Sequence, residues 1–393
     1  MPIRRFLHHF IHLEVSGGIA LGLATILALF LANTPLHSDY QNLLNFSIPL
    51  GPIHFSFLHL INDGLMTIFF FLVSLEIKRE LIQGELNTRA KALLPTFAAI
   101  GGMLVPALFY LLINQGYPAL TSGWAIPMAT DIAFSLGVLS LLGKQIPASL
   151  KFFLMALAII DDLCAIIVIA IFYTQQIGWL YLLAALLALI GLLTLNYYQI
   201  ERFFPYALFG LGLWLLILNS GIHATIAGVL FGFSIPITTR KNSVSLLHRL
   251  IHQLHPWIAY GILPLFAFAN AGLSFSGIHF QTFLHPLPLG IIIGLFLGKQ
   301  LGIFGASWLA VKTKLAKLPH QVNWWHIYGT ALICGIGFTM SLFIATLAFT
   351  DNELSSLVRL GVLAGSTLSG IAGYSLLFFK RKKPIRVQTT KIH

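Results

Sequence analysis

The sequence predicts an all-α protein that crosses a membrane many times. Hydrophobic residues make up 57% of its 393 residues, whereas only 9% of the residues are charged. A soluble protein of this length needs a charged surface, and this chain has too few charged residues to provide one. Apolar runs of about 20 residues, the length at which a helix spans a bilayer, recur along the whole chain.

Twelve such runs are expected to form transmembrane helices, and short loops join them into a single transporter-sized membrane domain over residues 1–393. The first run lacks a small-residue cleavage site, which favours a retained helix over a cleaved signal peptide. Hydropathy leaves one boundary open, because the stretches 203–218 and 220–234 would form one long helix or two short ones. The predicted spans are 13–32, 57–75, 92–113, 121–142, 150–173, 178–198, 203–218, 220–234, 257–273 (with an earlier start expected), 287–311, 326–349 and 355–379.

The lysines and arginines decide that boundary and set the topology. Two crossings between residues 203 and 234 place the basic residues before and after them on one side, as the positive-inside rule requires. Every lysine and arginine except Lys299 and Arg359 then falls on that side. We therefore expect both termini, including the basic tail 380–393, in the cytoplasm. The formal charge of +11 reflects this topology, and no nucleic-acid partner is expected.

The longest outer loop, residues 33–56, contains the stretch FSIPLGPIHF. Its PLGP segment at residues 49–52 is a turn signal between two short extended stretches. A β-hairpin and an irregular loop both fit this pattern.

Once the charges of the loops and of the span edges are set aside, a short list of five charged residues remains. An acid at the membrane centre costs about 2.5–3.5 kcal/mol on insertion scales, so such residues point to function and need partners. Four acids and one lysine do not cancel, so some acids must be protonated part of the time or bind a cation from outside. The five residues are Asp63, Asp131, Asp161, Asp162 and Lys299.

Asp161 and Asp162 are adjacent in the stretch AIIDDLCAII. Neighbours on a helix point about 100° apart, so a structural ion pair with Lys299 would account for one aspartate and leave the other. Burial and mutual repulsion disfavour two charged carboxylates and couple their titration. A pair of this kind can exchange protons for a small cation, and the sequence predicts ion or proton coupling here.

Two spans carry residues that interrupt a helix in mid-membrane. In AIPMATDIAFSLG, Pro127 precedes Asp131, and in CGIGFTMS, Gly335 and Gly337 are close together. Either stretch alone would fit a kinked helix. One interrupted span in each half of the chain, however, is typical of a transporter site built from broken helices. The positive N-terminal and negative C-terminal half-helix ends would suit Asp131 and Lys299, respectively.

Lys299 lies beside a stripe of small residues. Gly294, Gly298 and Gly302 recur at every fourth position, which lets another helix pack closely. Snorkelling to the surface is a poor explanation for Lys299, because it lies deep within its span. Asp63 lies nearer an outer edge, and we expect a structural role for it.

The sequence resembles the NhaA sodium/proton antiporters from about residue 13 to the basic tail. The matching stretches include NDGLMTIFFFLVSLEIKREL, LAIIDDLCAI, NSGIHATIAGV, HPWIAYGILPLFAFANAG and CGIGFTMSLFIA. The resemblance implies twelve helices with inverted repeats, of which the fourth and eleventh are unwound in mid-membrane and cross near the site. These antiporters are among the proteins from which the broken-helix rule was drawn, so the two arguments are not independent.

The resemblance implies electrogenic exchange of cytoplasmic Na⁺ or Li⁺ for more than one external proton, with no cofactor. By position, Asp162 would be the principal cation ligand and Asp161 its partner in proton exchange, paired with Lys299. Thr130 and Asp131 fall in the unwound chain, where they would supply oxygens or offset helix ends. Protons and the cation would compete for one site that is exposed alternately to each side.

A cytoplasmic pH-response region is also implied, together with a homodimer in the bacterial inner membrane and roles in pH homeostasis and salt tolerance. The proposed hairpin would contribute to the dimer. His223 matches a family histidine, for which we expect packing or hydrogen bonding. The pH-response region maps onto Glu76, Lys78, Arg79 and Glu80 and onto the start of the ninth span.

At the start of the ninth span the sequence departs from the family. His248 and Ile251 stand where the best-known members carry a lysine and a glutamate. His248, His252 and His255 fall at helical spacing on one face. Because histidine titrates near neutrality, this cluster is a candidate pH sensor. An interfacial stripe without a role is the alternative.

Three other functions share some of these features. Intramembrane aspartyl proteases place two aspartates on separate helices, one in a G-x-G-D motif that this chain lacks. A cation channel needs a continuous pore and has no need of a coupled acid pair. A sodium-coupled symporter for an organic anion remains the main alternative, and it predicts sodium moving in the same direction as the substrate.

Overall fold

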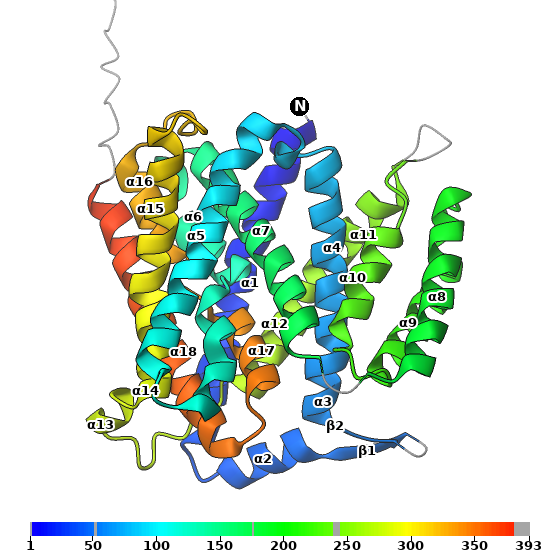
Figure 1. The fold of residues 1–393 in the computed structure, drawn as a ribbon, viewed down its shortest axis with the longest axis horizontal. Helices are drawn as coiled ribbons and strands as arrows, with labels where there is room; N and C mark the ends of the chain where they lie inside the picture. Colours follow the sequence, from blue (N-terminus) through cyan, green and yellow to red (C-terminus); the bar gives the residue numbers. More distant parts are fainter. Residues whose placement is uncertain (1, 51–52, 175–176, 239–243, 381–393) are drawn as a thin grey trace, which may run out of the picture.

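The computed structural model describes residues 2–50, 53–174, 177–238 and 244–380. Helices run between the two ends of the molecule, and 3₁₀ helices and π-helical turns, labelled η, interrupt several of them (Figure 1). Among the described residues, six helices are long and apolar enough to cross a membrane, and three bent helix pairs meet the same criterion together. The expected all-α polytopic membrane fold is confirmed.

Each predicted span corresponds to one helix or to consecutive helical segments. In chain order these are α1 (Pro2–Ala32), α3 (Phe57–His59) with η1 (Leu60–Leu65) and α4 (Met66–Ile82), α5 (Arg89–Asn114), η3 (Pro118–Met128) with α6 (Ile132–Leu141), α7 (Ala148–Phe172), α8 (Trp179–Tyr197), α9 (Phe203–Leu218), α10 (Thr225–Ser234), α11 (Leu246–Trp257) with η5 (Ile258–Ile262) and α12 (Leu263–Asn270), α14 (Pro286–Ile293) with η6 (Gly294–Gly298) and α15 (Lys299–Lys312), α16 (Trp324–Ile333) with α17 (Phe338–Ala348), and α18 (Asn352–Phe379).

The shorter elements lie in the loops. They are α2 (His37–Asn45), β1 (Ser47–Leu50), β2 (Ile53–Ser56), η2 (Glu85–Asn87), η4 (Gly143–Gln145) and α13 (Phe280–Phe283).

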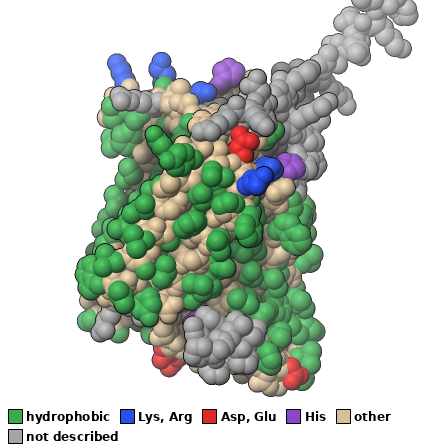
Figure 2. All heavy atoms as spheres, turned by 90° about the vertical axis from the view of Figure 1, so that its right-hand side faces the viewer, with side chains coloured by type: hydrophobic (Ala, Val, Ile, Leu, Met, Phe, Trp, Pro, Cys, Tyr) green, Lys and Arg blue, Asp and Glu red, His purple; other side chains and the backbone are tan. Residues whose placement is uncertain are grey.

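The outer surface is apolar in its middle and charged toward its ends. Figure 2 shows this on one face, where hydrophobic side chains cover the central band and the charged side chains lie above and below it. Helix α8 presents large exposed side chains such as Leu180, Leu187 and Ile190 along its length. Side chains of this kind are stable when lipid covers them, and the chain is a multi-pass membrane protein.

Both ends of the described chain lie at the same end of the molecule (Figure 1). We call this end, where α1 begins and α18 finishes, the terminal end, and the opposite end, which carries β1 and β2, the hairpin end. The starts of α5 and α7 also lie at the terminal end. The predicted basic tail lies outside the described residues from 381 onward.

The loop 33–56 contains more structure than the sequence indicated. Helix α2 turns through 116° from α1 and lies across the hairpin end (Figure 1). It is anchored because Tyr40 is buried and donates a hydrogen bond of 2.6 Å to the carbonyl oxygen of Phe268. Strands β1 and β2 pair antiparallel, with Ser47 opposite Ser56. The predicted turn is only partly described, because residues 51–52 lie outside the described ranges.

Three helices extend beyond the predicted apolar runs. Helix α1 begins at residue 2 rather than 13, α4 continues to Ile82, and α11 begins at Leu246, which agrees with the earlier start expected for the ninth span. Hydropathy detects only the part of a helix that lies in lipid, whereas backbone hydrogen bonding continues into polar sequence. Helix α11 is amphipathic, with Leu250 buried and Arg249 exposed, so its first turns do not form an apolar run.

The predicted stripe of small residues packs against α5 and η3. A Cβ atom at Gly302 would lie 2.1 Å from the carbonyl oxygen of Gly101, and one at Gly298 would lie 2.7 Å from Cα of Pro106. A Cβ atom at Gly294 would lie 2.7 Å from Cβ of Pro127. These contacts bring the backbone of the tenth span against the third and fourth spans. Lys299, on the tenth span, therefore lies in the centre of the molecule.

Replacing Gly302 by alanine should therefore destabilise the protein. The new methyl group would overlap the backbone of α5, and overpacking of this kind costs about 1–3 kcal/mol. Gly305→Ala on the same helix is the matched control, because nothing lies within 4 Å of its Cβ position. Thermal unfolding in detergent should show a lower midpoint for Gly302→Ala and an unchanged or higher midpoint for Gly305→Ala. Equal midpoints for the two variants would contradict the packing argument.

Candidate ion-binding site

The centre of the molecule is organised around Lys299, which is fully buried. Its Nζ donates hydrogen bonds of 2.8 Å to Oδ2 of Asp161 and 2.8 Å to Oγ1 of Thr130. It also donates to the carbonyl oxygen of Met128 at the end of η3. An ammonium group has three donors, and these contacts occupy all of them. The tenth span is thereby joined to the fourth and the fifth.

The two interrupted spans break where the sequence predicts and meet each other at the breaks. Helices η3 and α6 are bent by 45°, and α16 and α17 by 44°. The amide of Asp131 donates to the carbonyl oxygen of Ile336 at 2.8 Å, and Oγ1 of Thr130 donates to the carbonyl oxygen of Cys334 at 3.1 Å. Each break therefore supplies partners for backbone groups that the other leaves without helical bonds.

Glycine is required at the second break because the backbone of other spans approaches it closely. A Cβ atom at Gly335 would lie 2.4 Å from the carbonyl oxygen of Leu295. At Gly337 it would lie 3.0 Å from the carbonyl oxygen of Ala129, which belongs to the first break. These two residues thus permit the crossing of the two broken spans.

Asp131 lies between the starts of two half-helices. Its Oδ1 accepts from the amide of Phe134 at 2.9 Å and so caps α6. Its Oδ2 accepts from the amide and the hydroxyl of Thr339, in the first turn of α17, at 3.1 and 2.5 Å. The positive ends of both helices therefore face this carboxylate. The predicted match between charged residues and half-helix ends is found here, and again where Lys299 meets the end of η3.

Asp162 differs from the other buried acids. It is 1% exposed, and neither of its carboxylate oxygens has a hydrogen-bond partner in the described part of the chain. Together with Asp131 and Thr339 it lines a pocket, which we call the central pocket. Glu76 and His255 line the same pocket. Glu76 lies in the half of α4 that is nearer the terminal end, and His255 lies in the last turn of α11.

The central site is oxygen-rich and has an excess of acids. Asp131, Asp161 and Asp162 are each 1% exposed, whereas Lys299 is a buried base that contacts one of them, Asp161. Within the described residues, no three histidine, cysteine or acidic side chains come together as in a resident metal centre. The arrangement suits a hard monovalent cation held by carboxylate, hydroxyl and carbonyl oxygens.

The predicted pH-response residues divide into two groups in the structure. Glu76 and His255 are paired within the central pocket, with Oε1 and Nε2 separated by 3.8 Å. The three remaining residues of α4 make other contacts. Arg79 and Glu80 form an ion pair of 2.8 Å with each other, and Lys78 donates to two carbonyl oxygens at the end of α10.

The three histidines of α11 lie in different environments. His255 is buried, His252 is exposed, and His248 is half-buried with its Nδ1 2.7 Å from Oγ of Ser245. Only His255 reaches the central pocket. The helical spacing suggested that the three histidines would respond to pH together. Their exposure to solvent is unequal, so they do not share one environment.

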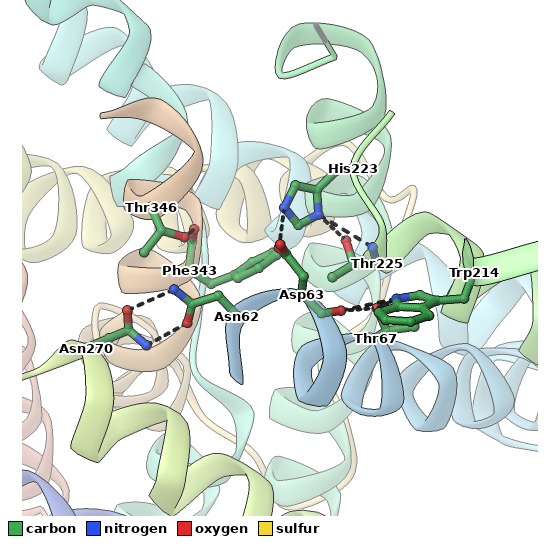
Figure 3. A network of polar contacts seen from close by, with 9 residues as sticks. All are labelled: Asn62, Asp63, Thr67, Trp214, His223, Thr225, Asn270, Phe343 and Thr346. Atoms are coloured by element: carbon green, nitrogen blue, oxygen red, sulfur yellow. Dashed lines mark hydrogen bonds and ion pairs between the residues drawn. The ribbon is translucent and has the colours of Figure 1, made fainter. Parts of the chain in front are cut away.

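Asp63 and His223 form a separate cluster (Figure 3). Nε2 of His223 lies 3.5 Å from Oδ1 of Asp63, and its Nδ1 lies 2.8 Å from Oγ1 of Thr225. The indole of Trp214 donates to Oγ1 of Thr67 at 3.1 Å, just after the π-helical turn η1 that contains Asp63. The cluster joins the second span to the seventh and eighth, which agrees with the structural role expected for Asp63 and the hydrogen-bonding role expected for His223.

A family model described as Na⁺/H⁺ antiporter 1 matches residues 8–377, nearly the whole chain. The chain belongs to the Na⁺/H⁺ antiporter 1 family. It is 50% identical over 382 residues to the Na⁺/H⁺ antiporter NhaA of Pseudomonas fluorescens, covering 96% of this chain and 97% of that protein. It is 52% identical over 386 residues to NhaA 1 of Syntrophotalea carbinolica, covering 96% and 98%.

The resemblance inferred from the sequence is thereby confirmed. A third relative, the Na⁺/H⁺ antiporter NhaA of Vibrio parahaemolyticus, is 48% identical over 376 residues, with 95% and 97% covered. Antiporters are transporters, so membership of this family assigns the chain to the transporters and removes the intramembrane protease from consideration.

Sequence reasoning missed two contributors to the site. Thr339 was not singled out, although it lies two residues after Gly337 in CGIGFTMS and is a hydroxyl next to a predicted break. This position next to a predicted break is the signal by which the sequence could have identified Thr339. The Met128 carbonyl oxygen was also missed, because a backbone acceptor has no side chain by which a sequence could reveal it.

Thr339→Val should lower stability. Valine keeps the shape but removes the hydroxyl that donates to the Asp131 carboxylate, and bonds to charged groups contribute about 1.5–3 kcal/mol. Thr330→Val is the control, because Oγ1 of Thr330 is buried without a hydrogen-bond partner in the described chain. Thermal unfolding should show a lower midpoint only for Thr339→Val. The same loss in both variants would mean that the hydroxyl bond is not the cause.

Proposed function

We propose that the chain is an electrogenic antiporter that exchanges cytoplasmic Na⁺ or Li⁺ for external protons at Asp161 and Asp162. The observation that carries this proposal is the buried carboxylate of Asp162, whose two oxygens have no hydrogen-bond partner in the described residues. An ionised carboxylate in such a place carries a large desolvation penalty. Asp162 therefore holds either a proton or a cation, and the two compete.

The neighbours of Asp162 support the choice of cation. Sodium and lithium are hard ions that bind oxygen ligands. Asp161 and Thr130 supply a carboxylate and a hydroxyl beside the first break, and Asp131 lies in the same pocket as Asp162. We assign Asp162 as the principal ligand, Asp161 as its partner, and Thr130 and Asp131 as supporting groups.

The proposed exchange is electrogenic because the site holds two carboxylates. One Na⁺ brings one positive charge, whereas two protons leave the site if the cation displaces one from Asp162 and a second from the Asp161–Lys299 pair. Lys299 balances Asp161 in the state described here, with 2.8 Å between the charged groups. Cation binding at Asp161 would weaken this ion pair, so the charge of Lys299 is coupled to occupancy of the site.

Alternating access follows from the two broken spans. Their half-helices contact each other at the breaks, for example where the amide of Asp131 donates to the carbonyl oxygen of Ile336, and a small rearrangement there would expose the site to the other end. Glu76, which lines the central pocket together with Asp162, lies in the half of α4 that is nearer the terminal end. Since the basic residues indicate that this end is cytoplasmic, we assign the state as facing the cytoplasm.

We further propose that the protein is a homodimer in the bacterial inner membrane, with both termini in the cytoplasm and roles in pH homeostasis and salt tolerance. Strands β1 and β2 project sideways from the helices at the hairpin end (Figure 1). A two-stranded sheet leaves strand edges that can pair with another chain, which supports a role of the hairpin in dimer formation.

The antiport proposal predicts the behaviour of Asp162→Asn. In inside-out vesicles with an imposed pH gradient, Na⁺ or Li⁺ should collapse the gradient with the native protein, and the variant should abolish this response. Asp63→Asn is the matched control and should keep it, because Asp63 lies in the separate His223 cluster.

Native-like exchange by Asp162→Asn would show that the aspartate pair is not the exchange site. If inserted native protein moved no protons at any pH with either ion, antiport itself would be wrong, and the organic-anion symporter would become the leading function.

The Glu76–His255 pair predicts how the exchange responds to pH. At acidic pH a protonated His255 neutralises Glu76, whereas at alkaline pH the neutral imidazole leaves the negative charge of Glu76 facing the central pocket and attracting cations. Glu76→Gln should therefore raise the apparent KM for Na⁺ several-fold at alkaline pH and change it little at acidic pH. Glu353→Gln is the control, because Glu353 is exposed in the first turn of α18. An unchanged KM profile in Glu76→Gln would exclude this role for Glu76.

A further inference from the structure

A second pocket opens at the terminal end, away from the broken helices. Its walls come from the start of α5, the start of α7 and the segment between α15 and α16. Oγ of Ser149 donates a hydrogen bond of 2.5 Å to the carbonyl oxygen of His320, which holds that segment against α7. We call it the rim pocket. It shares no lining residue with the central pocket.

The rim of this pocket is cationic. Lys91 from α5 and Lys317 and His320 from the segment before α16 line it and are exposed. The described residues that line it include no acid. Helices α5 and α7 both begin beside it, and neither start is capped by the side chain of its preceding residue. The positive ends of these two helices add to the lysine charges.

The floor of the rim pocket is apolar. Leu94, Phe152 and Phe153 lie about one turn along α5 and α7 from the charged rim and line the same space. A pocket with a cationic rim and an apolar floor fits a ligand with an anionic head and a hydrocarbon chain. A free inorganic anion would use the rim and leave the apolar surface uncovered.

The rim pocket lies at the level of the lipid headgroups. At the same end, Lys312 lies over the ring of Trp308 at 4.3 Å, and Lys380 lies over the ring of Trp325 at 4.5 Å. Tryptophan and lysine together are enriched where a membrane meets water. Figure 1 places the ends of α15 and α18 at the terminal end, where α5 begins.

We propose that the rim pocket binds an anionic phospholipid, with its phosphate headgroup at Lys91 and Lys317 and the first part of an acyl chain over Leu94 and Phe152. Basic pockets between transmembrane helices recognise lipid headgroups in this way. The chain's own C-terminal segment RKKPIRVQTTKIH is basic and would be repelled from this rim. The site is independent of the proposed exchange mechanism and requires only that the protein spans a membrane.

Native mass spectrometry of the full-length protein in detergent can test this proposal, with dioleoyl phosphatidylglycerol and dioleoyl phosphatidylcholine as probes. The native protein should retain phosphatidylglycerol preferentially. Lys91→Gln with Lys317→Gln should weaken that binding by about fivefold for each lysine removed. Lys312→Gln with Lys314→Gln is the charge-matched control, since neither residue lines the rim pocket. An unchanged size-exclusion profile would show that both double variants are folded.

Several results would overturn the proposal. Equal retention of the two lipids by the native protein would remove the selectivity, and equal losses in both double variants would indicate general surface charge. Competition with inorganic phosphate and glycerol 1-phosphate separates the sources of the anion. Displacement of phosphatidylglycerol by inorganic phosphate at similar concentration would identify a free-anion site. Weak displacement by both, and strong displacement by a phosphatidylglycerol whose acyl chains give it a different mass, would support a site that needs head and chain together.

Discussion

The packing of the spans at the site depends on one buried ammonium group, that of Lys299. Lys299 has no exposed surface, and a charge in that position is tolerated only when its donors are all satisfied. Its acceptors come from Asp161 on the fifth span and from Thr130 and Met128 at the break of the fourth. A different packing of these spans would leave the charge unpaired. One side chain therefore fixes three spans relative to one another at the level of the site.

The two broken spans satisfy each other's backbone groups at the points where their helices end. A helix that ends in the membrane leaves amide and carbonyl groups that water cannot satisfy. Asp131 accepts from the first turns of both α6 and α17, and its amide donates to the other break at Ile336. The negative charge of Asp131 thus stabilises a crossing that neither span would form alone. The same arrangement leaves Asp162 as the buried acid without a hydrogen-bond partner among the described residues.

Much of the candidate site could be predicted because membrane burial makes charged residues conspicuous. Asp131, Asp161, Asp162 and Lys299 stand out from an apolar background, and each lies within the centre that the structure describes. The π-helical turn ahead of Lys299 and the 3₁₀ form of η3 were not predicted, since both depend on packing against neighbouring spans. Helix α2 was missed because its polar sequence carries no hydropathy signal.

The sequence by itself determined the class of protein, the number and order of the spans, and the places where two of them break. Hydrophobic length, basic residues and helix-breaking residues act locally, so they can be read along the chain. Only the tertiary structure decided that Asp161, and not Asp162, pairs with Lys299. It also decided that Thr339 donates a hydrogen bond to Asp131 across the breaks. Such pairings depend on the rotation and depth of helices that are far apart in sequence, which local patterns do not specify.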